Sequence, residues 1–155
     1  MRIGAVALCM VAVPLSGGPV LAGAAPTQPE RAAVEAVVQA YAAGLRQADL
    51  AGLRSAFADA GQFIARNRDG SLVTAAFATV LPTWVSKPDD KVEILIDQVS
   101  MPTPAMAAIT ARLRTTPRCY DDQLLLYRGG DGWRIVAKTT EPWADCGNWP
   151  KRPGR

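Results

Sequence analysis

The stretch that decides the fold is AAVEAVVQAYAAGLRQADLAGLRSAF, residues 32–57. Its apolar side chains recur at the spacing of one helix face, at Val34, Val37, Val38, Tyr41 and Leu45. Asp49 then has the type and the place of an N-cap, and apolar residues follow it again at helical spacing. We therefore expect a long helix over residues 30–47 and a short helix over residues 50–58, which together cover a sheet.

The second half of the chain changes to a period of two, which is typical of strands with one buried face. Apolar and polar residues alternate at residues 92–97 and within residues 107–115, and we expect residues 120–127 and 133–140 to form the third and fourth strands. The Gly-rich loop at residues 128–132 joins the last two segments as a hairpin. Helices followed by antiparallel strands indicate an α+β fold.

The middle of the chain is less regular. Gly61 ends the short helix, residues 62–67 fit a strand, and residues 67–70 read as a turn. The apolar pattern then predicts a third helix over residues 74–85, which is kinked or restarts at Pro82, because proline removes a backbone hydrogen bond inside a helix.

The first residues have the pattern of a secretory signal peptide. Arg2 precedes a short apolar run, and the small residues at positions 22–24 fit the rule for cleavage before Ala25. The apolar run is too short to span a bilayer. We therefore expect a periplasmic or secreted protein, divided into a signal peptide at 1–24, a flexible leader at 25–30, one domain at 31–146 and a basic tail at 147–155.

The charge of the chain argues against a nucleic-acid partner. The 155 residues include 17 basic and 14 acidic side chains, a formal net charge of +3. Processing would remove Arg2, and three of the remaining bases lie in the tail. The body is then close to neutral and has no basic stripe interleaved with aromatic residues, so we expect no nucleic acid as a partner.

Two cysteines, Cys119 and Cys146, remain after processing, which fits an exported chain with one disulfide. If Tyr127 pairs with Trp133 in the last hairpin, Cys119 lies opposite Glu141, a few residues before Cys146. This placement favours the disulfide, and two unpaired thiols are the alternative.

The chain contains no histidine. Its absence excludes Ser–His and Cys–His nucleophile pairs and histidine-ligated metal sites. The sequence also lacks a metal-binding cluster and a phosphate-binding glycine loop, so we expect no metal and no cofactor. Any catalysis would have to depend on Asp, Glu, Tyr, Lys or Arg.

Two segments resemble a known superfamily. The first runs from Val37 through Asp49 to Asp59, and the second is DDQLLLY, residues 121–127, followed by DGWRIVAK, residues 131–138. They are similar to the opening helices and the final hairpin of the nuclear transport factor 2-like superfamily, in the branch named putative lumazine-binding. The superfamily includes ketosteroid isomerase and SnoaL-like proteins. The resemblance implies a cystatin-like cone, in which helices pack on a strongly curved antiparallel sheet around a pocket, and members are often homodimers.

The resemblance to the isomerase covers only part of its catalytic set. Tyr41 matches the tyrosine that donates to the oxyanion, and Asp122 falls near the protonated aspartic acid that shares this role. The position of the general base falls near Ala65, and Asp69 comes several residues too late. The sequence therefore favours a binding pocket over isomerase activity.

We expect the pocket to lie between the long helix and the concave sheet, lined by Tyr41, Phe63, Trp84, Asp122, Leu124 and Trp133, and to hold a small apolar or aromatic molecule. One alternative is a SnoaL-like or isomerase-like enzyme that uses Tyr41 and Asp122. Another is a dimeric interaction module whose open sheet face is the interface. A plainer interpretation leaves Tyr41 as a core tyrosine, Asp122 as a solvated acid, and Arg112 and Arg114 as solvent-facing side chains.

Overall fold

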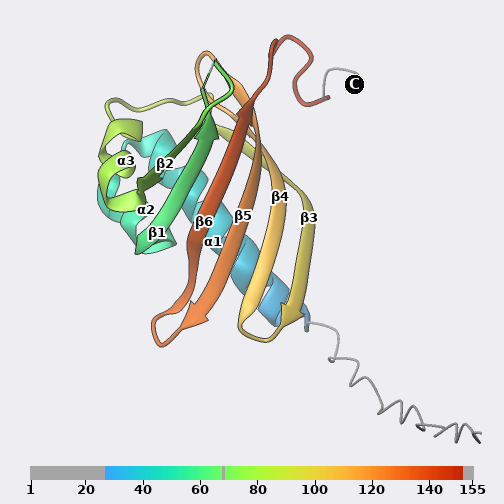
Figure 1. Cartoon of the computed structure of the whole chain (residues 1–155). Coiled ribbons are helices and arrows are strands. Elements are labelled where there is room, and N and C mark those ends of the chain that lie inside the picture. Colours follow the sequence, from blue (N-terminus) through green and yellow to red (C-terminus); the bar gives the residue numbers. More distant parts are fainter. Residues whose placement is uncertain (1–26, 68, 152–155) are drawn as a thin grey trace, which may run out of the picture.

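The computed structural model of the chain describes residues 27–67 and 69–151. The predicted signal peptide, residues 1–24, lies outside the described residues. The described residues form three helices that lie on one side of a single six-stranded sheet (Figure 1). Within the described ranges, no helix combines the length and the apolar character needed to cross a membrane.

The long helix α1 (Gln28–Gln47) begins two residues before the predicted start, because Thr27 caps it. The Thr27 hydroxyl accepts a hydrogen bond from the Glu30 backbone N–H at 3.4 Å, and the Glu30 side chain accepts one from the Thr27 N–H at 2.9 Å. Pro29 lies in the first turn, where its missing N–H costs nothing. The helix ends at Ala48, which adopts a left-handed conformation with φ 54°.

The short helix α2 (Leu50–Ala56) packs closely against the end of α1. Gly44 makes this approach possible, since a Cβ atom there would lie 2.7 Å from the Leu53 side chain. Asp49 occupies the N-cap position, but its side chain makes no capping hydrogen bond. The helix stops at Ala56 rather than at residue 58, because Phe57 already begins the first strand.

The sheet consists of β1 (Phe57–Arg66), β2 (Leu72–Ala76), β3 (Glu93–Thr103), β4 (Met106–Arg114), β5 (Cys119–Gly129) and β6 (Gly132–Pro142). Its order is β2-β1-β6-β5-β4-β3, and each strand from β3 to β6 is antiparallel to the next. The pair β1 and β6 is parallel, which alternating sequence patterns do not reveal. The predicted α+β class is confirmed, and the sheet is antiparallel except at this one pair.

Two predicted boundaries are corrected by strand pairing. The segment at the start of the predicted third helix is strand β2, which pairs with β1 so that Gln62 lies opposite Ala76. The helix itself, α3 (Phe77–Trp84), keeps Pro82 inside it. Strand β3 continues through Met101 and Pro102, beyond the predicted end at residue 97, because an edge strand tolerates a proline without a backbone donor.

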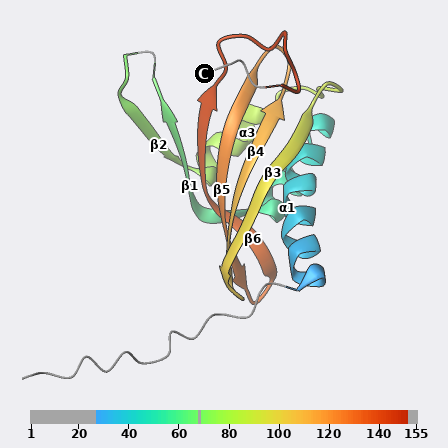
Figure 2. The same cartoon turned by 90° about the vertical axis from the view of Figure 1, so that its right-hand side faces the viewer.

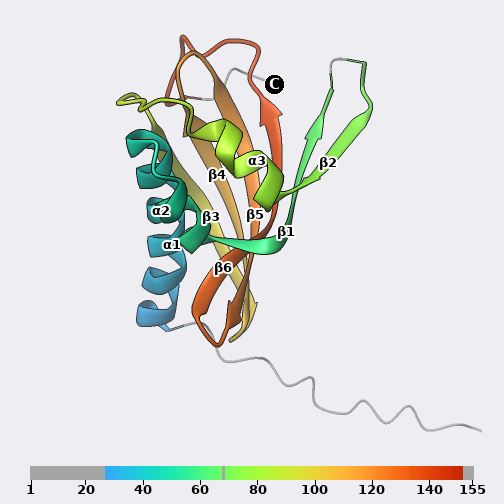
Figure 3. The same cartoon turned by 90° about the vertical axis from the view of Figure 1, so that its left-hand side faces the viewer.

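The sheet is strongly curved, and all three helices lie on its concave side (Figures 2 and 3). The hairpin formed by β1 and β2 projects away from the other strands, and the pairing of β1 with β6 is irregular between Phe57 and Gln62. At this bend a Cβ on Gly61 would lie 2.5 Å from the Phe77 ring, so α3 can pack directly on the backbone of β1. The bend therefore places α3 beside one end of the concave face.

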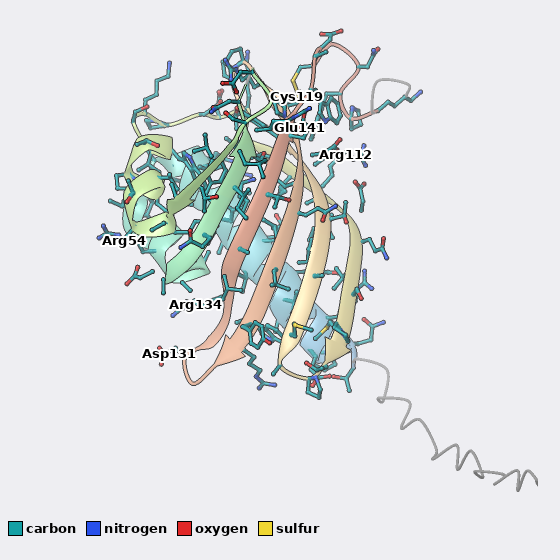
Figure 4. All side chains as sticks on the ribbon, viewed as in Figure 1. Arg54, Arg112, Cys119, Asp131, Arg134 and Glu141 are labelled. Atoms are coloured by element: carbon teal, nitrogen blue, oxygen red, sulfur yellow. A yellow bond between two sulfur atoms is a disulfide. The ribbon has the colours of Figure 1, made fainter. Side chains whose placement is uncertain are left out.

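The segment after β6 packs at the end of the sheet where β5 begins, near Cys119 (Figure 4). Cys119 and Cys146 form the predicted disulfide, and the Trp143 backbone N–H donates to the Cys119 carbonyl at 2.8 Å. Trp149, in the predicted basic tail, donates from its Nε1 to Glu93 at 2.6 Å. The first residues of the predicted tail therefore pack against the edge of the sheet.

Arg112 and Arg114 do more than face solvent, which corrects the plainer interpretation of the sequence. Arg112 forms an ion pair with Asp97 at 2.6 Å, and Arg114 forms one with Glu93, also at 2.6 Å. The Arg114 guanidinium also lies 5.6 Å from the centre of the Trp149 ring. These arginines therefore join β4 to the edge strand β3 and to the segment that follows β6.

Candidate functional site

A cavity of about 250 Å³ lies between α1, α3, the loop after α3 and the concave face of β5 and β6. Four aromatic side chains from four different elements contribute to its wall: Tyr41, Phe63, Trp84 and Tyr120. Two polar side chains of β6, Lys138 and Thr140, form its floor. Its rim includes Lys87, Asp89, Thr115 and Thr116 from two loops.

The aromatic wall is held by ring packing rather than by hydrogen bonds. The centre of the Trp84 ring lies 5.4 Å from that of Phe63 and 6.2 Å from that of Tyr41. The Tyr41 ring in turn packs edge-on against Phe57 at 5.1 Å. Because Trp84 is the last residue of α3, the position of this helix determines the position of the aromatic wall.

The floor of the cavity covers a buried ion pair between Asp122 of β5 and Lys138 of β6. Both side chains are almost completely inaccessible, at 0% for Asp122 and 3% for Lys138. The Thr140 hydroxyl donates to Asp122 Oδ1 at 2.7 Å, and the Lys138 ammonium contacts the same oxygen. Among the described residues, Asp122 Oδ2 and Lys138 Nζ have no hydrogen-bond partner beyond this ion pair. The hydrogen-bonding capacity of this buried pair is therefore incompletely satisfied.

Burial shifts the ionisation of two groups at the floor. Desolvation raises the pKa of Tyr41 well above its usual value, and the nearby negative charge of Asp122 raises it further. Desolvation lowers the pKa of Lys138, against the opposing attraction of Asp122. The Lys138 ammonium also lies 5.6 Å from the centre of the Tyr41 ring, which supplies a second favourable contact for the cation.

Among the described residues that line the cavity, Asp89 is the one acid. It accepts hydrogen bonds from the Thr116 backbone N–H at 2.6 Å, from the Thr116 hydroxyl at 2.9 Å and from the Lys91 N–H at 3.1 Å. Desolvation alone would raise the pKa of Asp89, but these hydrogen bonds together outweigh it and the pKa is lowered. Asp89 therefore joins two rim loops and is a poor general base.

The predicted pocket residues fall in four places. Tyr41, Phe63 and Trp84 line the cavity, and Asp122 lies beneath its floor, in contact with two residues that line it. Leu124 is buried in the apolar core instead. Trp133 lies at the other end of α1, beside a separate depression formed with Pro29, Ala33 and Val37.

Lys138 and Thr140 were not among the predicted pocket residues, because residues 133–140 do not alternate regularly between apolar and polar types. Trp133 and Ile135 are buried, and strict alternation would place Lys138 on the outer face. The pairing of β5 with β6 is irregular, however, with Leu126 opposite Ile135 and Leu125 opposite Ala137. Val136 is the extra residue of a bulge, which turns Lys138 and Thr140 to the inner face.

The described residues offer no site for a metal ion. No group of three or more His, Cys, Asp or Glu side chains in this part of the chain is arranged to hold one.

Comparison with known families matches residues 29–140 of the chain to a family described as "Putative lumazine-binding". The match spans both helices of the first segment and all but the end of β6. A comparison with curated proteins finds no match.

Solved structures share the fold at low sequence identity. A nuclear transport factor 2-like protein of unknown function from Shewanella baltica is 17% identical with a TM-score of 0.71, over 78% of this chain and 100% of that one. A ketosteroid isomerase-like protein from Erwinia carotovora atroseptica is 18% identical with a TM-score of 0.61, over 77% and 100%. A cystatin-like domain of unknown function from Nostoc punctiforme is 15% identical with a TM-score of 0.60, over 74% and 78%. These likenesses confirm the nuclear transport factor 2-like fold and its cystatin-like architecture.

Proposed function

Because the chain belongs to the family described as "Putative lumazine-binding", we propose that it binds a small, mainly apolar or aromatic molecule in the cavity between α1, α3 and the sheet. One observation carries the proposal. The cavity combines a wall of aromatic rings with a polar floor, which is the usual composition of a small-molecule site.

The size of the cavity limits the ligand. Its volume of about 250 Å³ lies just below the range of roughly 300–1,000 Å³ that is usual for drug-sized ligands. The rings of Phe63 and Trp84 present edges and faces against which a flat molecule can pack. A ligand of one or two fused rings therefore fits better than a steroid or a long chain.

The acidic groups at the cavity, Asp89 and Asp122, favour ligand binding without catalysis. The isomerase-like alternative needs a general base, and the one acid among the described lining residues, Asp89, has a lowered pKa and three hydrogen bonds. Asp122 Oδ1 accepts from Thr140 and contacts Lys138, so this oxygen is an acceptor within the protein. These engagements favour a binding protein over a proton-transfer enzyme.

We place this function outside the cytoplasm. The support is the disulfide between Cys119 and Cys146, since such bonds persist in oxidising compartments, together with the signal-peptide pattern of the sequence. The intact mass of the protein from an exporting host tests this proposal. Loss of residues 1–24 supports it, and a full-length chain retained with the cytoplasmic fraction contradicts it.

Ligand binding is tested with the purified protein, its disulfide intact, by native mass spectrometry and by thermal shift with lumazine and naphthalene as probes. We expect a stabilising shift, and about tenfold weaker binding by Trp84→Ala, because that variant removes apolar contact area from the wall. Trp149→Ala is the matched control, since Trp149 lies outside the cavity lining. The proposal fails if neither probe nor any co-purified molecule binds.

A homodimer is a second proposal, and the outer face of the sheet favours it. A shallow groove on β3 to β6 is lined by uncharged side chains that include Gln98, Thr110, Gln123, Leu125 and Thr139. Few charges would have to be desolvated if two such faces met. Native mass spectrometry tests this, with a dimer lost on Leu125→Lys as the supporting result and a monomer in the wild type as the contradicting one.

A further inference from the structure

We propose that the floor of the cavity recognises the edge of a neutral, planar cyclic amide, a ring in which a carbonyl stands beside an N–H. The inference rests on the proposed binding function and names the chemical class of its ligand. It follows from the polarity of two neighbouring side chains, Lys138 and Thr140, each of which can play only one hydrogen-bonding role toward the cavity.

Lys138 can only donate. An ammonium group carries three N–H donors and no acceptor. Its contact with Asp122 uses part of this capacity, and Nζ has no other hydrogen-bond partner among the described residues. A buried donor left in this way costs free energy unless a ligand or a water molecule accepts from it. A carbonyl oxygen entering the cavity would remove that cost.

Thr140 can only accept. Its single hydroxyl hydrogen is donated to Asp122 Oδ1 at 2.7 Å. The remaining lone pairs of the oxygen can therefore accept, and Thr140 itself lines the cavity. Asp122 is the positioning residue in this arrangement, because it fixes the direction of the hydroxyl without lining the cavity.

The donor and the acceptor are close enough to serve one ligand edge. Lys138 and Thr140 lie two residues apart on the same face of β6, and both contact the same oxygen, Asp122 Oδ1. A cyclic amide presents its carbonyl oxygen and its N–H side by side in one plane. The carbonyl would accept from Lys138 while the N–H donates to Thr140, which satisfies both groups at once.

The charges around the cavity favour a neutral ligand. At the floor Lys138 is paired with Asp122, and at the rim the charges of Lys87 and Asp89 have opposite sign. No excess of positive charge is left to compensate a carboxylate or a phosphate. The aromatic wall formed with Phe63 and Trp84 in turn favours a flat ring, so the ligand class is a neutral, planar lactam or imide.

Three bicyclic probes of similar size test this polarity: 2-quinolone, its N-methyl derivative and naphthalene. The first offers both a carbonyl and an N–H, the second only the carbonyl, and the third neither. Titration of the wild-type protein by fluorescence should show affinity falling in that order. We expect affinity to fall about three- to tenfold from each probe to the next, which is the usual contribution of one hydrogen bond.

Two variants assign each step to one side chain. Thr140→Val keeps the shape of the side chain and should bring 2-quinolone to the affinity of its N-methyl derivative. Lys138→Met should bring the N-methyl derivative to the affinity of naphthalene. Thr139→Val is the matched control, because Thr139 is the neighbouring residue on the outer face and should leave the order unchanged.

The outcomes separate this inference from the binding function. If the wild type binds all three probes equally, or if Thr140→Val still prefers 2-quinolone over its N-methyl derivative, the inference is overturned while the binding function stands. If none of the three probes, and neither lumazine nor any co-purified molecule, binds, both are overturned. Should Lys138→Met fail to fold, the order of affinities in the wild type and in Thr140→Val still decides.

Discussion

The concave face of the sheet is closed at one end and open at the other, although the same strands β5 and β6 build both ends. At the closed end Leu126 of β5 lies opposite Ile135 of β6, and both belong to one apolar core with Val34 and Val38 of α1. At the open end Asp122 lies opposite Thr140, beneath Tyr41 and the cavity. The two ends thus differ in the chemistry of their inward side chains.

The difference between the two ends shows how one small domain can hold both a stabilising apolar core and a polar cavity. The closed end contributes the apolar burial that drives folding. The open end carries an ion pair whose desolvation is costly, and such pairs add little net stability. We infer that the open end is retained for recognition, and the following variants test this division from the largest expected effect to the smallest.

Asp122→Ala should be the most damaging change at the open end. It leaves the Lys138 ammonium buried without its partner, and breaking a buried pair in this way costs about 3–5 kcal/mol of the free energy of unfolding. Urea denaturation measures the loss. The double variant Asp122→Leu with Lys138→Met should recover most of it. A double variant as unstable as Asp122→Ala would show that the pair itself stabilises the fold.

Leu126→Ala should destabilise the closed end without affecting recognition. Leu126 is fully buried, and removing its side chain leaves a cavity that costs about 2–5 kcal/mol. The same urea experiment gives the loss, and titration of the folded variant with 2-quinolone should give the wild-type affinity. A matching loss of affinity would mean that the two ends are not independent.

Tyr41→Phe should change how stability depends on alkaline pH. Folding raises the pKa of Tyr41 above its ordinary value of 10.0, so its contribution is complete below pH 10 and is lost as the pH rises further. The wild type should therefore lose about 1.4 kcal/mol per pH unit more than the variant above pH 10. Lys138 acts in the opposite direction, because folding lowers its pKa, and its contribution largely cancels in this comparison.

Urea unfolding of the wild type and of Tyr41→Phe between pH 9 and pH 11.5 measures this difference. Stability curves that run parallel over the whole range would contradict a strongly buried Tyr41 hydroxyl. Tyr127→Phe is a suitable control, since Tyr127 is 48% exposed and should leave the curve unchanged.

Glu141→Gln should have the smallest effect. Glu141 pairs with Arg66 on the surface, where the two side chains are 51% and 57% exposed. Solvent and salt screen such a pair, so we expect the urea midpoint to stay within the error of the measurement. A shift comparable to that of Asp122→Ala would remove the distinction between the buried and the exposed ion pair.

The inner positions of β5 could be predicted from the sequence, whereas those of β6 could be predicted only in part. On β5 the alternation of Asp122, Leu124 and Leu126 is regular, so Asp122 was expected beside the pocket. On β6 the bulge at Val136 exchanges the inward and outward positions, and Lys138, the partner of Asp122, was not among the predicted pocket residues. A bulge is a property of two paired strands, and no single segment predicts it.

The amino-acid sequence by itself determined the elements whose causes are local. The apolar period and the cap at Thr27 specify α1, alternation specifies β3 and β4, and the hairpin of β5 and β6 brings Cys119 near Cys146. The tertiary structure alone decided the parallel pairing of β1 with β6 and the inward turn of Lys138. These features depend on which strands meet and in which register, and such contacts between distant segments leave no periodic pattern in either segment.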